Sequence, residues 1–592
     1  MRKKRVKGNR YKRLFILYRK DFLKFMEYII LFAALILFYL FVVIQGKSSE
    51  RKLKKYFIRR LKKEYETLNK SEYSNERMAA ASGMFDWHQG EGFVIDDITW
   101  NDIDGDRLYR NINHCYSSAG DEYLYYRMRT PILHEDAEEF RKNEEIYHFF
   151  RENEEERIKF QLLFAGLGRT GKFSLYRYLR YLCELPGKRA IVFIVPWILI
   201  LVSVALLFVN IYVGITALFL IICYQNLTYM KKKKEVEPYL VSFQYILRML
   251  DASEKVAKNV PDVWAEEGRE LKRLRKELKD ISNGNIWFVA SDFSSNAATD
   301  IVSSVLMLVK MLTHVDLFIF YRMLGQVSSH TEEIDKINQI LGKMEVDITI
   351  SAFRNALPYF AVPSFGATGM QTAEAFHPLI EDAVSNSFRL EKGMLLTGSN
   401  ASGKSTFLKT VLICALLAQT IQTVPAKEYQ AERYRIFSSM SLRDNLESGE
   451  SYYMAEIRSI KRILEAVKED GVKVLCFVDE VLRGTNTVER IAAASEIMRS
   501  FSGKNMLCFA ATHDVELTRL LADVYENYHF EEQIENNDIL FPYKLLKGPA
   551  NTRNAIKLLS MMGYPDALIE NAEWMAGCFL QEGEWRNKEN RA

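Results

Sequence analysis

At 592 residues, 48% of them apolar, the chain is long enough for roughly two to four domains with buried cores. Its net charge of +4 is close to balanced, so the charge of the whole chain neither favours nor excludes a nucleic-acid partner. The seven cysteines are scattered without a CxxC pair or a Cys/His cluster, which excludes a disulfide framework and a zinc site and fits a reducing compartment.

The N-terminal region combines strong basic charge with a long apolar run. Residues 1–26 carry eleven Lys/Arg against one Asp, and Lys47 to Lys63 carries nine more. Such blocks suit either a nucleic-acid arm or the basic flanks of a membrane segment. Between them, residues 28–46 (YIILFAALILFYLFVVIQG) hold no charge. A signal peptide is the alternative, but no small-residue cleavage site follows, so we expect a transmembrane anchor.

Residues 190–230 form a second uncharged run, of 41 residues. One helix of that length would measure about 60 Å, roughly twice the hydrocarbon thickness of a bilayer. We therefore predict a transmembrane hairpin with Lys188-Arg189 and Lys231 to Lys234 on the cytoplasmic side; a buried soluble helix pair is the alternative and fits these charges poorly. A single span at 28–46 then puts the basic N-terminus outside, unless that first segment does not cross fully.

Residues 398–406 (GSNASGKST) match the pattern G-x-x-x-x-G-K-[ST] between an expected strand, GMLLTG, and an expected helix, FLKTVLICALLAQTI. This context disfavours the alternative, a chance match in a loop. Glycines let backbone N–H groups close around phosphates, and the helix N-terminus adds positive potential. We expect Lys404 to reach the β- and γ-phosphates of ATP and Ser405 to ligate Mg²⁺. The predicted nucleotide-binding residues of this loop are Gly398, Ser399, Asn400, Ala401, Ser402, Gly403, Lys404, Ser405 and Thr406.

A second glycine pattern, GLGRTGKF at 166–173, has the same glycine spacing but Phe173 in place of the metal-ligating hydroxyl. The segment before it, ERIKFQLLFAGL, is helical in period rather than strand-like. We predict an ordinary loop here.

Two further apolar runs end in polar residues. Residues 474–478 (VLCFV) precede Asp479 and Glu480, and residues 507–511 (LCFAA) precede His513. Continuous apolar runs of this length are typical of buried parallel strands. We expect Asp479 to hold the Mg²⁺ shell and Glu480 to orient or deprotonate the attacking water. A lone histidine is usually structural, but at this position we interpret His513 as a γ-phosphate sensor.

This order of motifs resembles the ABC-type ATPases, in which a loop of the partner subunit completes each site. The resemblance gives a role to SGESYYMAE at 448–456, which opens an expected helix from Ser451 to Lys468. Ser448, Gly449 and Ser451 would contact the γ-phosphate held by the other chain of a homodimer. An ordinary capped helix is the alternative.

Several motifs in series resemble the MutS family of DNA mismatch-repair ATPases. They are TGSNASGKSTFLKTV, DNLESGESYYMAEI, DEVLRGTNTVER and ATHDVELT, with AFHPLIEDAVSNSFRLEKG before them and a similar C-terminal helical segment after them. The resemblance covers about 350–578, and more weakly 99–131 and 235–345, which are similar to the family's helical core and lever. Leu482 replaces a usual Gly, and Glu489-Arg490 replaces Asp-Gly.

In the MutS family a DNA clamp is inserted between the two halves of the helical core. Here the apolar run 190–230 stands at that place, and neither a clamp nor an N-terminal mismatch-reading domain is recognisable. The resemblance implies a membrane-anchored ATPase that uses ATP and Mg²⁺ in a homodimer and is coupled to mismatched or branched DNA. The alternative is a nucleotide-switched protein that acts on a membrane or protein partner without binding DNA.

The expected fold is a C-terminal α/β P-loop domain of the ABC type, preceded by an all-α lever and core that a transmembrane hairpin interrupts. The expected location is the cell membrane, multi-pass, with the ATPase domain in the cytoplasm. The predicted parts are 1–46 (basic N-terminus and span 28–46), 47–189 (first core half), 190–230 (hairpin), 231–349 (second core half), 350–540 (ATPase) and 541–592 (C-terminal dimerisation helices).

Overall fold

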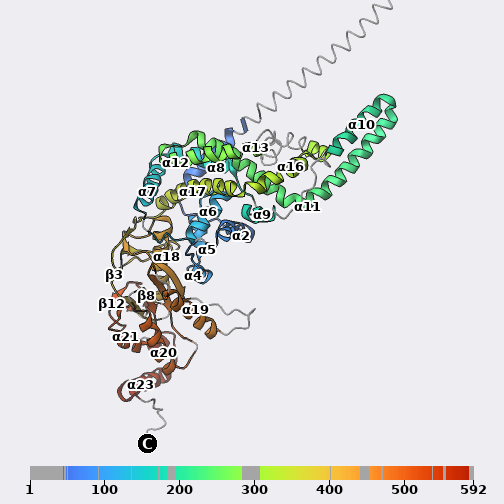
Figure 1. The fold of residues 1–592 in the computed structure, drawn as a ribbon. Coiled ribbons are helices and arrows are strands. Elements are labelled where there is room, and N and C mark those ends of the chain that lie inside the picture. The colour runs from blue at the N-terminus through green and yellow to red at the C-terminus, as the bar shows by residue number, and fades with distance from the viewer. Residues whose placement is uncertain are drawn as a thin grey trace, which may run out of the picture. The chain divides into compact units, whose positions relative to one another are not determined.

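The computed structural model, drawn as a ribbon in Figure 1, describes most of the chain. The chain clusters into two compact units. One unit comprises Met1–Lys63, Arg177–Asn259 and Glu266–Asn338; the other comprises Glu64–Tyr176, Val260–Ala265 and Gln339–Ala592. The described residues are 45, 48–49, 51–90, 92–134, 136–170, 174–182, 194–282, 307–399, 402–440, 452–468, 471–483, 485–503, 505–535, 538–550, 555–583 and 585. The predictions on the span 28–46 (but for Gln45), on Asn400 and Ala401, and on Ser448, Gly449 and Ser451 lie outside the described residues.

The first unit is helical. Its interior is apolar and aromatic, as in the edge-to-face contact of Phe243 with Phe320, whose ring centroids are 5.7 Å apart. The predicted boundary at residue 230 falls inside one continuous helix, α11, which runs through the four lysines of 231–234 without a break. The helices are α9 (Leu175–Leu182), α10 (Val195–Val209), α11 (Ile211–Asn259), α12 (Ala265–Glu277), α13 (Lys279–Ser282), α16 (Val315–Ser329) and the first turns of α17 (Thr331–Ala356).

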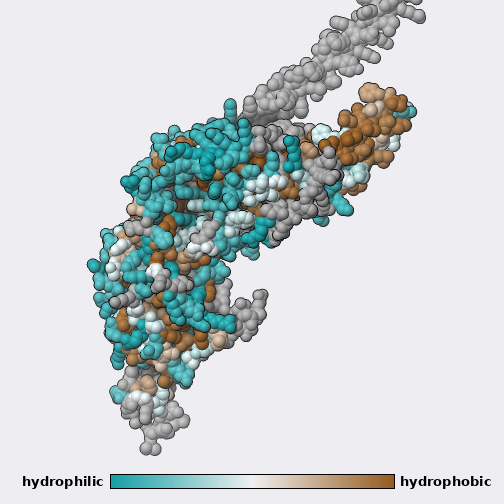
Figure 2. Space-filling view, viewed as in Figure 1, coloured by the Kyte–Doolittle hydropathy of each residue, from teal (hydrophilic) through white to brown (hydrophobic). Residues whose placement is uncertain are grey.

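Two described helices are long and apolar enough to cross a membrane by length and composition, Ile211–Lys234 of α11 and Lys404–Ile421. They differ in burial, which is 83% for the apolar stretch at Lys404–Ile421 and 11% for that in α11. The helix Lys404–Ile421 is therefore a core helix. The α10–α11 hairpin instead leaves its apolar side chains uncovered, as the brown surface over these helices in Figure 2 shows.

The helical part of the second unit precedes its sheets. Several helices start at a side-chain cap: Ser74, Asp96, Ser117 and Asp136 each accept hydrogen bonds from backbone N–H groups of the first turn. The helices are α2 (Asn75–Ala81), α3 (Gly83–Trp87), α4 (Asp97–Asp102), α5 (Gly105–Ile112), α6 (Ser118–Arg129), α7 (Ala137–Glu152), α8 (Glu154–Leu167), η2 (Asp262–Trp264) and most of α17.

Two larger sheets and a hairpin follow α17. A six-stranded sheet has the order β12-β9-β4-β8-β7-β6 and is parallel except for β12, and a four-stranded sheet has the order β1-β5-β2-β3. The strands are β1 (Ser364–Phe365), β2 (Met370–Ala375), β3 (Asn386–Leu390), β4 (Gly393–Thr397), β5 (Glu428–Ala431), β6 (Arg435–Ser439), β7 (Val474–Asp479), β8 (Met506–Ala511), β9 (Tyr525–His529), β10 (Gln533–Glu535), β11 (Asp538–Leu540) and β12 (Leu546–Lys547). The helices are α18 (Lys404–Ile421), α19 (Tyr452–Val467), α20 (Thr487–Ser500), α21 (Val515–Leu520), α22 (Ala555–Met561) and α23 (Asp566–Glu582).

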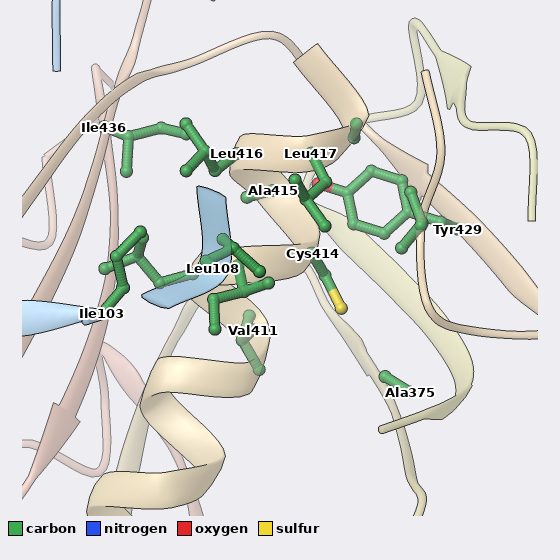
Figure 3. Close-up of a cluster of buried hydrophobic side chains, with 14 of the residues drawn as sticks. Ile103, Leu108, Ala375, Val411, Cys414, Ala415, Leu416, Leu417, Tyr429 and Ile436 are labelled. Carbon is green, nitrogen blue, oxygen red and sulfur yellow. The ribbon is translucent and has the colours of Figure 1, made fainter. Parts of the chain in front are cut away.

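Helix α18 is the centre of the main core cluster. Figure 3 shows its side chains reaching three neighbours: Cys414 points toward Ala375 of β2, Leu416 toward Ile436 of β6, and Leu417 toward Tyr429 of β5. Leu108 of α5 packs beside it. Because α18 is buried on nearly all sides, its sequence has no polar face.

In the second glycine pattern, Gly166 and Leu167 end α8, residues 168–170 form a loop, and 171–173 lie outside the described residues. Arg169 donates from Nε to Asp121 Oδ2 at 2.8 Å and also contacts the carbonyl of Cys115. The backbone N–H of Thr170 donates to Ser118 Oγ at 2.9 Å. These contacts attach the loop to α6.

Glu345 of α17 is fully buried and holds the start of α6. Its carboxylate accepts hydrogen bonds from the hydroxyl and backbone N–H of Ser117 and from the backbone N–H of Tyr116. Burial raises the pKa of Glu345 to about 7, although these hydrogen bonds oppose the shift.

The first prediction concerns Glu345→Gln. In the unfolded chain this carboxyl titrates near its ordinary pKa of about 4.3, so the native state binds the extra proton between that pH and about 7. The stability that the protonated carboxyl gives is present at low pH and is lost as the pH rises through 7. Between pH 5 and 8, wild type should lose about 2 kcal/mol of unfolding free energy relative to the variant. Urea denaturation across pH measures this, and a difference that does not change with pH contradicts it; Glu332→Gln, exposed on the same helix, is the control.

Candidate functional site

The candidate site lies where three parallel strands end. β8 pairs with both β4 and β7, so the segments after Thr397, Asp479 and Ala511 leave the sheet at one edge. In parallel α/β sheets, ligands bind at this carboxyl edge.

The loop from β4 to α18 depends on two glycines. Gly398 has φ 144° and Gly403 has φ 98°, which are left-handed conformations that side chains disfavour. A Cβ on Gly398 would come within 2.7 Å of the carbonyl oxygen of Phe530. Gly403 is the residue that precedes the first turn of α18. The loop can follow its path only because the G-x-x-x-x-G pattern places glycines at these two positions.

Lys404 folds its side chain over this loop. Its Nζ donates to the carbonyl oxygens of Gly398 and Ser399, each at 2.8 Å, and lies 3.4 Å from His513 Nε2. Burial lowers the pKa of Lys404, and the carboxylates of Asp479 and Glu480 oppose that effect. A desolvated ammonium group attracts an anion more strongly than an exposed one does.

Ser405 and Asp479 join the start of α18 to the end of β7. Ser405 Oγ donates to Asp479 Oδ2 at 2.5 Å. Burial raises the pKa of Asp479, and the hydrogen bond from Ser405 opposes it. The other carboxylate oxygen, Oδ1, is buried and has no hydrogen-bond partner among the described residues.

These two side chains fit Mg²⁺, which proteins usually hold through one or two oxygen ligands together with substrate phosphates. The orphaned Oδ1 of Asp479 supplies a hard oxygen beside the hydroxyl of Ser405. Among the described residues, no group of three or more His, Cys, Asp or Glu side chains is arranged to hold a metal alone. The phosphates of a nucleotide would therefore have to provide further ligands.

Glu480 is held from two sides. Its Oε1 lies 2.6 Å from His513 Nε2, and its Oε2 lies 2.5 Å from Arg483 Nε. The contact with His513, more than the charge of Arg483, lowers the pKa of Glu480. His513 Nε2 lies closer to Glu480 than to Lys404. We therefore assign the hydrogen to Nε2, which donates a hydrogen bond to the carboxylate. Both oxygens of Glu480 are thus engaged.

The helix after SGESYYM reaches the loop after β7. Glu456 of α19 is buried, and its Oε1 accepts the backbone N–H of Leu482, two residues after Glu480. Burial raises the pKa of Glu456, and its Oε2 has no partner among the described residues. The loop that follows β7 and helix α19 are therefore in direct contact.

A cavity of about 470 Å³ opens beside the first turn of α18. Its lining includes Lys404 to Phe407 and the rings of His377, Phe530 and Tyr543, with Val384 at its exposed side. Burial lowers the pKa of His377 to about 4, so this ring is neutral at physiological pH. The volume falls within the range of about 300–1,000 Å³ that is usual for small-molecule sites.

One neighbouring ion pair was not expected from the sequence. Arg490 of α20 forms a two-point ion pair with Asp514, with Nη2–Oδ1 at 2.6 Å and Nε–Oδ2 at 3.0 Å. Both residues line a smaller cavity of about 210 Å³ next to Glu480 and His513. The pair ties the segment after His513 to α20.

Comparisons with known proteins agree on one family. Residues 394–578 match the model for MutS domain V. A DNA mismatch repair protein MutS of Desulforapulum autotrophicum is 28% identical over 300 residues, covering 48% of this chain and 33% of that protein. A DNA mismatch repair protein MutS of Thermosipho melanesiensis is 31% identical over 274 residues, covering 44% and 33%, and the human MutS protein homolog 4 is 29% identical over 279, covering 44% and 29%.

The match and the fold together define a protein with a MutS domain V in its C-terminal part and a mostly helical part before it. Through this domain the chain is similar to members of the MutS family, as the sequence motifs indicated. It spans about a third of the length of these curated relatives.

The structure brings Lys404, Ser405, Asp479, Glu480 and His513 together. The sequence reading assigned no role to Arg483, His377 or the Arg490–Asp514 pair. All four residues lie inside the quoted motifs: His377 in AFHPLIEDAV, Arg483 and Arg490 in DEVLRGTNTVER, and Asp514 in ATHDVELT. Their positions therefore carried a signal, but the pairing of Arg490 with Asp514 depends on tertiary packing and left none.

The second prediction uses the backbone of Leu482. This residue is 5% exposed and has φ 59°, in the left-handed region that favours glycine. Leu482→Ala and Leu482→Gly both lose the buried side chain, but only alanine keeps the strain. Leu482→Gly should therefore be the more stable of the two by about 1 kcal/mol, the reverse of their order in a helix. Urea denaturation ranks them, and a more stable alanine variant would show that the loop is not strained.

Proposed function

We propose that this chain is a magnesium-dependent ATPase that acts as a homodimer and is held in a membrane by its α10–α11 hairpin. The observation that carries the proposal is the meeting of a lysine, a serine, two carboxylates and a histidine at the carboxyl edge of one parallel sheet. The MutS domain V match over the same residues supports it.

In this proposal Lys404 exchanges its contacts with loop carbonyls for the β- and γ-phosphates of ATP. Ser405 and Asp479 hold Mg²⁺, which, when bound, neutralises charge that develops on the transferred phosphoryl group. Glu480 is ionised at neutral pH because its pKa is lowered, so it can accept a hydrogen bond from the attacking water. It must first release one of its two partners, His513 or Arg483.

The cavity beside α18 would take the nucleoside. It adjoins Lys404 and Ser405, so a triphosphate bound over the loop directs its base and ribose toward it. The neutral His377 and the aromatic rings of Phe530 and Tyr543 offer flat apolar faces to a base.

The partner chain would supply Ser448, Gly449 and Ser451, which precede α19. Binding of these residues to the γ-phosphate would place ATP between two protomers. Glu456 of the same helix contacts the backbone next to Glu480, which gives the dimer contact a route to the catalytic carboxylate.

The third prediction separates binding from hydrolysis. Glu480→Gln should bind ATP, hydrolyse it about 10²–10⁴ times more slowly, and sediment as a dimer with ATP, because the water loses its base. Lys404→Ala should lose ATP affinity by at least about tenfold, since it removes a charge-assisted contact. Lys409→Ala, on the same helix, is the matched control. Sedimentation of Glu480→Gln that ATP leaves unchanged would refute the dimer.

The fourth prediction fills the cavity. Val384→Trp should weaken ATP binding by at least about tenfold by occupying the space for the base. Its affinity for inorganic tripolyphosphate should not change, because the loop and Lys404 are intact. Val362→Trp, at another exposed valine outside the cavity, is the control. Equal losses for ATP and tripolyphosphate, measured by calorimetry, would contradict a nucleoside site.

The partner of this ATPase defines two candidate functions. The relatives are named DNA mismatch repair proteins, which favours coupling to mismatched or branched DNA. The uncovered hairpin favours the alternative, a nucleotide switch for a membrane or protein partner. We place DNA coupling first.

The fifth prediction distinguishes these functions. If DNA is the partner, the detergent-purified chain should bind mismatched or branched duplex more tightly than homoduplex, and ATP should change that difference. Phosphate contacts alone give binding that falls steeply with salt and ignores DNA structure. Titration of each duplex across a salt series with and without ATP measures both. A structure-independent background that salt abolishes would support the membrane or protein partner instead.

A further inference from the structure

The turn of the α10–α11 hairpin is as apolar as its sides. Phe208, Val209 and Tyr212, which flank the turn, are 89%, 83% and 80% exposed, and Ile211 and Val213 beside them are exposed as well. A hairpin that crosses a bilayer usually presents polar residues to the water on the far side. Here the single residue between the helices is Asn210, and beside it only Tyr212 adds a polar group, its hydroxyl, to the turn.

Asn210 uses its side-chain oxygen and both of its backbone polar groups within the turn. Its side-chain oxygen accepts the backbone N–H groups of Tyr212 at 3.0 Å and Val213 at 3.3 Å. Its backbone N–H donates to Leu206, and its carbonyl accepts from Gly214, both at 2.9 Å. Polar groups paired in this way tolerate a hydrocarbon environment, whereas an open loop does not.

The opposite end of the hairpin is polar and packs against charged groups. Gln225 donates to the carbonyl of Pro196 at 3.3 Å, which joins the two helices. His314 Nε2 lies 3.2 Å from the carbonyl of Gln225, and the Tyr229 hydroxyl donates to Asp316 Oδ2 at 2.7 Å. Trp197 and Tyr224, next to Pro196 and Gln225, are exposed, as aromatic residues at a membrane interface are.

The distance along the hairpin from its polar end at Gln225 to its turn at Asn210 is short. From Gln225 to Asn210 the helix rises over 15 residues, or about 22 Å at ~1.5 Å per residue. The hydrocarbon core of a bilayer is about 30 Å thick. If the level of Gln225 marks the near edge of that core, the turn ends inside it, about 8 Å before the far edge.

We propose that the hairpin is re-entrant: it enters and leaves the bilayer through one face, and Asn210 lies among the acyl chains rather than in water on the far side. This inference rests on the membrane attachment proposed above. The ligand is a phospholipid bilayer, recognised by the apolar surface from Trp197 to Tyr224, with the lysines at 231–234 toward its headgroups. No part of the hairpin would then be available to a partner on the far side.

A spin label at residue 210 tests the depth of the turn. Asn210→Cys is made in the full chain with Cys183, Cys223 and Cys578 changed to Ser, because Cys115, Cys414, Cys476 and Cys508 are buried and can remain. The protein is reconstituted in vesicles of zwitterionic and anionic phospholipids, with a water-soluble nickel chelate on both sides. Collision with the chelate and with oxygen is measured by power saturation. Labels at Leu220→Cys, in the middle of the exposed helix, and Lys231→Cys, at its basic end, are matched controls.

A re-entrant hairpin predicts chelate collision at 210 several-fold lower than at 231, with oxygen collision high at both 210 and 220. Chelate collision at 210 as high as at 231, with 220 protected, would mean that the turn reaches the far side; that result overturns the re-entrant placement alone. Chelate access at 220, or release of the protein by alkaline carbonate, would overturn the membrane attachment and the re-entrant placement together.

Discussion

The burial of α18 is the constraint on which the candidate site depends. The helix is covered by the main sheet, by the second sheet and by the helical segment that holds Leu108, so its first turn cannot shift without disturbing all three. Lys404 and Ser405 begin that turn. The strand order then places the ends of β8 and β7 beside it, and the distances from Lys404 to His513 and from Ser405 to Asp479 follow.

Contacts around Glu480 connect this rigid centre to more peripheral elements. Glu456 reaches the backbone of Leu482 from α19, and Arg490 holds Asp514 from α20. The start of α19 is therefore linked to the residues that follow Glu480 through the carboxylate of Glu456. The backbone of the loop after β7 is strained, because Glu480 and Leu482 both have φ above 50°.

Much of the candidate site could be predicted because its residues follow continuous apolar strands. A run such as VLCFV is buried on both faces in only one common arrangement, a parallel sheet, and the residue after it must then lie at the carboxyl edge. The cavity could not be predicted in this way, since its lining comes from positions within 375–386 and 403–410 and from Phe530 and Tyr543, and depends on tertiary packing. The continuation of α11 past the lysines at 231–234 was not predicted either, because the change from apolar to charged residues there was interpreted as a boundary. Helix propensity gives no such boundary, since lysine and leucine are both good helix formers.

The continuity of α11 has a mechanical consequence. The helix runs 49 residues without a break, which corresponds to about 73 Å. Its first half carries the exposed apolar surface, and its second half is packed through Tyr245 and Leu250 into the helical interior. Pro238 lies between these two halves, and a proline inside a helix removes one backbone hydrogen bond and is the usual place for a bend. The helix would consequently bend most easily at Pro238, so the hairpin could keep its angle to a bilayer while the helical interior tilts.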